Sequence, residues 1–145
     1  MPDSQQPTSC APSTVAHTPQ DATLDLAITA ARIADERKGG DILVLHVADV
    51  TSLADYFVLI TGYSKVQVRA IARSIEAAIK ESLNRVPLRL EGMADGAWVL
   101  QDYGDVIVHV LLPQERDFYN LEAFWGHAQR VDVSPYLSPY PVRHR

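Results

Sequence analysis

The sequence predicts one small α/β domain of the α+β type, with a mixed five-stranded sheet flanked by helices. Two short apolar runs rich in β-branched and aromatic residues, 42–47 and 56–61, are typical of buried strands. A segment with helical spacing separates them from three further strand-like runs, and a helix in that place permits a right-handed parallel crossover. The expected order of elements is α-β-β-α-β-β-β-α.

The first helix is expected at about 22–38, before the two strands. Gly39 follows it and is a natural stop, because glycine adopts the left-handed conformation that ends many helices. The second helix is expected after Gly62, where Ser64 and Gln67 have the spacing of a capping box. Its apolar face comprises Val68, Ile71, Ala72, Ile75 and Ile79.

The second half of the chain predicts three strands and a helix. The strands are expected at 88–91, 97–101 and 105–112. Pro113 suits the first turn of a helix, which is expected to continue to about Trp125. The larger apolar side chains on or near one side of this helix are Phe118, Leu121, Phe124 and Trp125.

Composition and charge narrow the classes of function. The 145 residues are 47% hydrophobic and carry 13 Lys and Arg against 18 Asp and Glu, for a net charge of −5. An acidic chain gains little from neutralising phosphates, so direct nucleic-acid binding is not expected as the main activity, whereas a basic protein partner is compatible. The single cysteine, Cys10, excludes an intramolecular disulfide and a zinc site built mainly from cysteines.

The chain is expected to divide into three parts. Residues 1–20 are rich in Pro, Ser, Thr and Gln, and we expect disorder because they bury too little apolar surface to offset the entropy of ordering. Residues 21–128 form the domain, and 129–145 form a proline- and tyrosine-containing tail. The absence of a membrane-length apolar run and of a secretory signal pattern favours a cytoplasmic protein.

The segment 97–110 has the pattern of a hairpin. Gly104 takes a positive φ without penalty, so a three-residue loop at 102–104 is expected, with Gln101 opposite Asp105. In this register one face of the hairpin holds Trp98, Leu100, Val106, Val108 and Val110. The other face holds Val99, Gln101, Asp105, Ile107 and His109.

The residues alone leave two interpretations of the loop open. Tyr103 is expected at the tip between Asp102 and Asp105, and a rigid aromatic ring surrounded by charge is typical of a binding hot spot. Alternatively, the carboxylates only fix the turn, and the statistics of isolated turns favour this interpretation. Trp98 has a similar ambiguity between core packing and partial exposure. His109 is expected to be a half-buried structural residue.

A nucleotide-dependent enzyme is the alternative function. Asp102 and Asp105 are carboxylates able to hold a divalent metal, and the turn at 61–64 could offer backbone N–H groups to a phosphate. The similarity to a nucleotidyltransferase is weak, because the carboxylates straddle a turn and the glycine turn lacks the spacing and lysine of a P-loop.

A homodimeric scaffold that uses the last helix or the segment 136–140 is a third possibility.

Six blocks of sequence stand in order between residues 54 and 122. They are ADYFVLITGYS at 54–64, QVRAIA at 67–72, EG at 91–92, WVL at 98–100, DYGDVIVHV at 102–110 and ERDFYNLE at 115–122, followed by Trp125. Together these blocks resemble the ribosomal silencing factors, also called the Iojap family. The two tails fall outside the resemblance.

The resemblance implies a function. Proteins of this family dock on large-subunit ribosomal protein L-fourteen, cover the surface that the small subunit uses, and lower translation when nutrients are scarce. The family fold is related in topology to nucleotidyltransferases but lacks their catalytic residues, so no enzyme activity, metal or cofactor is expected. The partner is a large ribosomal subunit.

The resemblance also implies where the partner binds. The docking surface maps to Trp98, Asp102, Tyr103, Gly104 and Asp105, and by extension to Asp55, Tyr56, Glu115, Arg116 and Tyr119. In this mapping Trp98 and Tyr103 are apolar anchors, although many relatives carry an aliphatic residue in place of the tyrosine. The two aspartates are a charged rim that pairs with Lys or Arg of the partner.

Overall fold

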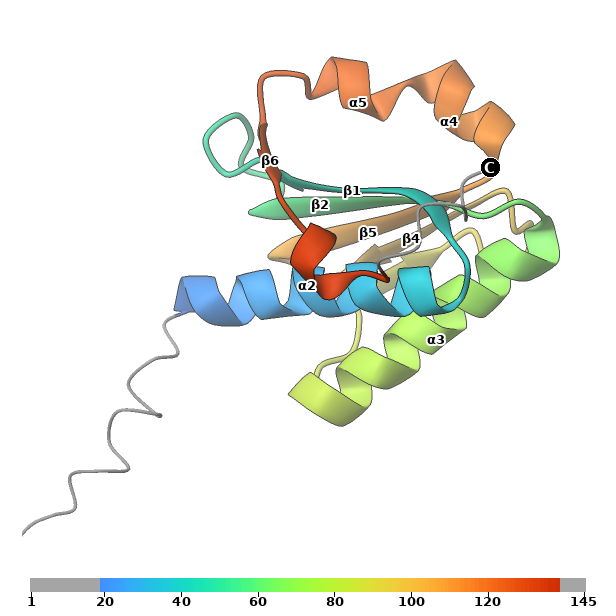
Figure 1. The fold of residues 1–145 in the computed structure, drawn as a ribbon, viewed down its shortest axis with the longest axis horizontal. Coiled ribbons are helices and arrows are strands. Elements are labelled where there is room, and N and C mark those ends of the chain that lie inside the picture. Colours follow the sequence, from blue (N-terminus) through green and yellow to red (C-terminus); the bar gives the residue numbers. More distant parts are fainter. Residues whose placement is uncertain (1–18, 139–145) are drawn as a thin grey trace, which may run out of the picture.

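The computed structural model describes residues 19–138, and Figure 1 shows their arrangement. The elements are α2 (Pro19–Glu36), β1 (Gly40–His46), β2 (Tyr56–Thr61), α3 (Lys65–Leu83), β3 (Arg89–Glu91), β4 (Trp98–Asp102), β5 (Val106–Leu111), α4 (Pro113–Tyr119), α5 (Leu121–Phe124), β6 (Gln129–Val131) and the 3-10 turn η2 (Ser134–Tyr136). The predicted disorder of 1–20 falls outside the described residues, except that α2 already begins at Pro19. Residues 139–145 of the expected tail also lie outside them.

One mixed sheet organises the fold, with the strand order β3-β4-β5-β2-β1-β6. β2 and β5 are parallel, and the other neighbouring strands are antiparallel. The predicted α+β class and mixed sheet are confirmed, but the prediction of five strands is wrong. The sixth strand, β6, lies in the expected tail and pairs with the edge of β1, where Val131 is opposite Val44. The folded part of the chain therefore continues past residue 128.

Helices cover both faces of the sheet (Figure 1). α2 and α3 lie on one face, and α4 and α5 lie over the other. The larger core cluster fills the first layer and includes Leu26 of α2 and Ile75 of α3, both fully buried. A smaller cluster around Phe57 lies on the other face, where Leu121 and Trp125 pack against it. None of the helices in the described residues is long and apolar enough to cross a membrane.

α3 forms as its sequence predicts. Its buried residues are Val68, Ile71, Ala72, Ile75 and Ile79. The Ser64 hydroxyl accepts a hydrogen bond from the Gln67 N–H at 3.0 Å, and Gln67 Oε1 accepts one from the Tyr63 N–H at 2.7 Å. Donors at the start of this helix are therefore satisfied within the chain.

The turn between β4 and β5 is tighter than predicted. The Tyr103 N–H donates to the Val106 carbonyl at 2.9 Å, so the loop consists of Gly104 and Asp105, two residues instead of three. Gly104 has a φ of 93°, and Asp105 is not among the residues with positive φ. Glycine with positive φ at the first position alone is the pattern of a type II′ turn, which suits the twist of a hairpin.

The shorter turn changes which face each side chain occupies. Gln101 pairs with Val108 instead of Asp105, a shift of three positions. Because side chains alternate along a strand, an odd shift exchanges the faces of one strand relative to the other. The two predicted faces are therefore wrong. Trp98 shares its face with His109, on the side of α4 and α5.

The last predicted helix is broken into two short helices. Asn120 adopts the left-handed conformation with a φ of 48°, so that α4 ends and α5 begins at Leu121. Phe118 is 80% exposed before this break, and its predicted place on the apolar side of a continuous helix is wrong. Leu121 and Trp125 do pack against the sheet.

Candidate protein-docking site

Three aromatic side chains form a ladder on the α4 side of the sheet. The ring centroids of Trp98 on β4 and Tyr119 on α4 lie 4.8 Å apart, and Phe118 contacts Tyr119 edge-on at 4.9 Å. Phe118 is 80% exposed and Tyr119 is 51% exposed, whereas Trp98 is half-buried. We call these three residues the aromatic ladder.

A shallow hollow adjoins the aromatic ladder at the edge of the sheet. It is lined by Glu91, Gly92, Trp98 and Leu100. Leu100 follows Trp98 by two residues on β4, so both side chains lie on the same face. Glu91 on β3 is opposite Leu100 on β4, and it forms an ion pair with Arg89 at 3.2 Å. The hollow thus has apolar walls and a charged rim.

Tyr103, the expected second anchor, lies in the core instead. Its side chain is 2% exposed and belongs to the cluster under α2 and α3. Burial raises the pKa of its phenol well above the usual range, and the Glu76 carboxylate raises it further. The two-residue turn leaves Tyr103 on the buried face of the hairpin, so its predicted exposure at the tip is wrong. So little exposed surface offers no anchor to a partner.

The two expected rim carboxylates have partners within the chain. Asp105 accepts two hydrogen bonds from Arg85 and one from the Thr23 hydroxyl, each at 2.9 Å. Burial alone raises the pKa of Asp105, but the bonds and charge of Arg85, together with Thr23, hold it below its usual value. Asp102 accepts a hydrogen bond from the Gly104 N–H at 2.8 Å, as a turn-fixing carboxylate does.

Two further expected residues lie away from the aromatic ladder. Tyr56 packs against the core cluster under α2 and α3, on the opposite face of the sheet. The backbone N–H groups of Asp55 and Tyr56 donate to the Asp105 carbonyl, at 2.8 and 3.2 Å. These contacts tie the start of β2 to the hairpin turn and give neither residue a place in the hollow.

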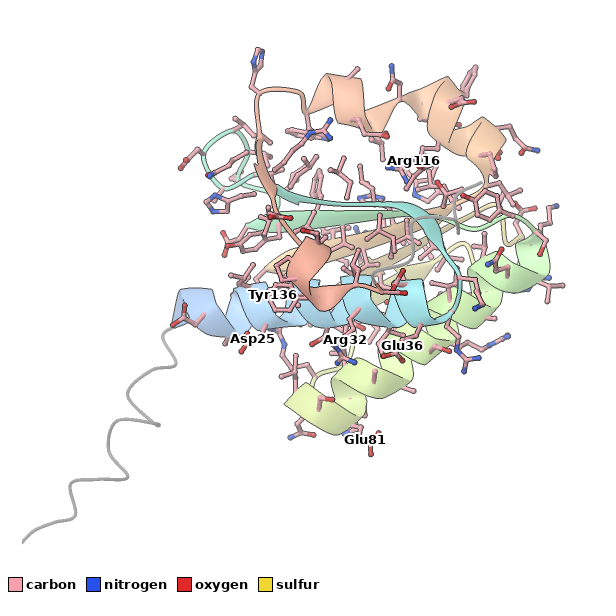
Figure 2. The ribbon with its side chains drawn as sticks, in the orientation of Figure 1. Asp25, Arg32, Glu36, Glu81, Arg116 and Tyr136 are labelled. Atoms are coloured by element: carbon pink, nitrogen blue, oxygen red, sulfur yellow. The ribbon has the colours of Figure 1, made fainter. Side chains whose placement is uncertain are left out.

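Arg116 connects α4 to the sheet. Its side chain is only 9% exposed and runs from α4 toward the sheet (Figure 2). Nη1 donates to the Thr61 hydroxyl at 2.9 Å, and Nε donates to Glu122 at 3.0 Å. The neighbouring Glu115 has one carboxylate oxygen, Oε1, that is buried without a hydrogen-bond partner in the described part of the chain. Arg116 thus fastens the helix that carries Phe118.

The structure brings Trp98 and Tyr119 together and adds residues that the sequence did not predict for the site. Leu100 could have been predicted from the sequence, because it follows Trp98 at the two-residue period of a strand. Glu91 becomes recognisable only once the pairing of β3 with β4 is known. Phe118 is spaced along the sequence like a residue on the apolar face of one continuous helix. Only the break at Asn120 places it outside the core.

The features that suggested a nucleotidyltransferase lie at opposite ends of the sheet. Asp105 precedes β5, and the parallel pairing of Val106 with Tyr56 places it beside the start of β2. The glycine turn follows the end of β2, and a strand of six residues spans about 20 Å. The Gly62 and Tyr63 N–H groups already donate within the chain. In residues 19–138 no cluster of three or more His, Cys, Asp or Glu is placed to hold a metal ion.

The chain matches a known protein family over most of its length. The model of the family described as "Ribosomal silencing factor during starvation" matches residues 19–144. The chain belongs to this family. It is 42% identical to ribosomal silencing factor RsfS of Bacillus subtilis over 104 residues, which cover 72% of this chain and 87% of the relative.

Other relatives of this silencing factor extend the comparison. A crystal structure of a protein from Chromobacterium violaceum has a TM-score of 0.69 and 38% identity, covering 77% of this chain and 92% of the other. The mouse protein named "Mitochondrial assembly of ribosomal large subunit protein 1" is 30% identical over 87 residues, which are 59% of this chain and 38% of that protein. The family is named for an effect on ribosomes, and its name describes no reaction.

Proposed function

We propose that the chain docks on the large ribosomal subunit through ribosomal protein L-fourteen, prevents the small subunit from joining, and so represses translation in the cytoplasm under nutrient limitation. Membership of the silencing family and the large-subunit name of the mouse relative support a ribosomal partner. The observation that carries the proposal is the aromatic ladder with its adjoining hollow, because it is a surface suited to bind another protein.

The exposure of the aromatic ladder supports docking. Phe118 and Tyr119 are both more than half exposed, and they continue the half-buried ring of Trp98. Aromatic residues are enriched at the centres of protein interfaces, where they supply most of the binding energy. A contiguous exposed apolar patch on a soluble protein commonly marks such an interface.

The charges around the aromatic ladder suit a basic partner. The Glu91 side chain is 58% exposed at the hollow, and Asp117 is exposed on α4 beside Phe118. The whole chain has a net charge of −5. Opposite charge on the partner would speed the encounter and disfavour wrong partners. We therefore place the charged rim at the exposed Glu91 and Asp117, in place of Asp105, whose side chain is only 26% exposed.

The proposed mechanism is steric and needs no chemical step. A folded domain bound at the subunit interface occupies space that the small subunit requires. The alternative, a nucleotide-dependent enzyme, has less support because its candidate carboxylate and its glycine turn lie at opposite ends of the sheet.

Substitution within the aromatic ladder tests the proposal. Trp98→Ala combined with Phe118→Ala should leave the fold intact and weaken co-sedimentation with large subunits about thirtyfold or more, because a true anchor contributes about 2 kcal/mol. Tyr136→Ala is the matched control, since Tyr136 is 48% exposed on η2, away from the ladder. A folded double variant that binds like the parent would show that this surface is not the docking site.

A further inference from the structure

A buried histidine lies directly beneath the aromatic ladder. His109 is 6% exposed on the central strand β5, opposite Leu100 of β4. Its Nδ1 accepts a hydrogen bond from the Trp98 indole Nε1–H at 3.2 Å, and the two ring centroids are 5.9 Å apart. The Phe57 ring contacts the imidazole edge-on at 5.4 Å. The indole is therefore bonded to a side chain that packing holds in place.

The hydrogen bond defines the protonation of the imidazole. A nitrogen that accepts a hydrogen bond carries no proton, so the proton of neutral His109 is on Nε2. Nε2 is buried and has no hydrogen-bond partner among the described residues. A buried donor without an acceptor destabilises a fold, and an apolar residue in this place would remove that cost. The bond from Nδ1 to Trp98 gives the histidine a role that an apolar residue cannot fill.

Packing encloses the Trp98 indole only in part. Trp98 is only half-buried, and its neighbour Tyr119 is 51% exposed. The bond to His109 is directional and selects the orientation in which the indole also contacts Tyr119 at 4.8 Å. Holding a side chain in its bound conformation before binding reduces the entropy lost on association.

We propose that His109 is a positioning residue for docking: it fixes the Trp98 indole so that the aromatic ladder is preformed before the partner arrives. This inference rests on the proposed function, because it concerns the same surface. It goes further by assigning to a buried residue, one that touches no partner, a share of the binding affinity.

A matched pair of substitutions tests the proposal. His109→Leu removes the acceptor, whereas His109→Asn has nearly the same size and keeps an amide oxygen near the position of Nδ1. In ¹H–¹⁵N spectra the Trp98 indole resonance, assigned with Trp98→Phe, should be shifted and exchange faster in His109→Leu. It should stay close to that of the parent in His109→Asn. Large-subunit affinity should fall about threefold to tenfold in His109→Leu and less in His109→Asn.

The outcomes separate this inference from the proposed function. A folded His109→Leu variant with an unchanged Trp98 resonance and unchanged affinity overturns it. If His109→Leu does not fold, long-range ¹H–¹⁵N spectra of the histidine-labelled parent decide: a proton on Nε2 supports the inference, and a proton on Nδ1 overturns it. A parent that does not bind large subunits contradicts the proposed function, while the indole resonances still show whether His109 positions Trp98.

Discussion

At the scale of single residues, burial sets the chemistry of His109. Removal from water disfavours the imidazolium and lowers the pKa of His109 from the usual 6.5 to about 4. The folded protein therefore keeps this histidine neutral at physiological pH. Neutral imidazole is the form in which Nδ1 accepts a hydrogen bond from Trp98.

The lowered pKa of His109 predicts a pH-dependent stability. Between pH 6.5 and about 4 the unfolded chain binds a proton at this residue and the folded chain does not, so acidification favours unfolding. The loss from this residue should reach on the order of 3 kcal/mol near pH 4 and level off below it. Urea denaturation of the parent and His109→Leu at pH 7 and pH 4.5 measures it. The exposed His127 provides the control His127→Gln, and a parent-like pH dependence in His109→Leu would contradict the assignment.

Tyr103 gives a second prediction at this scale. Its hydroxyl is buried without a hydrogen-bond partner in the described residues, and an unsatisfied polar group costs free energy. Tyr103→Phe should therefore leave the free energy of unfolding unchanged or raise it by about 1 kcal/mol, and large-subunit binding should stay at the parent level. Chemical denaturation and co-sedimentation check both results. Weaker binding by a fully folded Tyr103→Phe protein would restore this residue to the docking site.

The burial of a single residue was predictable from the sequence only where its neighbours along the chain determine it. Trp98 was recognised as a candidate anchor, and its position after Gly96 near the sheet edge permitted partial exposure. Tyr103 was misplaced because the loop comprises residues 104–105 and not the expected 102–104, so that Tyr103 precedes the turn on the buried face of the hairpin. Turn length depends on which hydrogen bond closes the hairpin, and here the bond runs from Tyr103 to Val106. The sequence does not reveal this bond, because two turn types fit the same glycine.

At the scale of elements, the position of α4 decides whether the aromatic ladder exists. Tyr119 and Phe118 end this seven-residue helix, which is too short to be stable without tertiary contacts. Arg116 supplies such contacts through its bonds to Thr61 at the end of β2 and to Glu122 on α5. The proposed docking surface therefore depends on a buried polar connection behind it.

Removal of this connection should affect stability and docking together. Arg116→Met should lower the free energy of unfolding by about 2 kcal/mol, because it leaves buried hydrogen-bonding groups without a partner. It should also weaken large-subunit binding by loosening α4. Arg32→Gln is the control, since Arg32 pairs with Glu36 on the exposed surface of α2 and should contribute less than about 0.5 kcal/mol. Equal effects of the two substitutions would rule out the anchoring role of Arg116.

The long elements and the three-residue strand β3 were predictable, but the short elements that follow Pro113 were not. α3 and the apolar strands have a period and caps that are visible in the sequence. β6 has only three residues, and its pairing with β1 comes from a free sheet edge, not from its own pattern. The break at Asn120 depends on a left-handed residue that is not glycine, which leaves no clear signal in the sequence.

At the scale of the whole molecule, the two faces of the sheet differ in how they are packed. The face under α2 and α3 holds the larger apolar cluster and gives the domain its stability. The other face is covered by the short helices α4 and α5 (Figure 1). This face carries the aromatic ladder and the hollow beside it. A stable layer on one side thus supports the proposed binding surface on the other.

The central claim is that docking through the aromatic ladder prevents subunit joining. Light scattering during the mixing of small subunits with large subunits pre-incubated with the protein measures this directly. The parent and Tyr136→Ala should suppress the rise in scattering, and the folded Trp98→Ala, Phe118→Ala double variant should restore it. Undiminished joining in the presence of saturating parent protein, or equal suppression by the double variant, would contradict the claim.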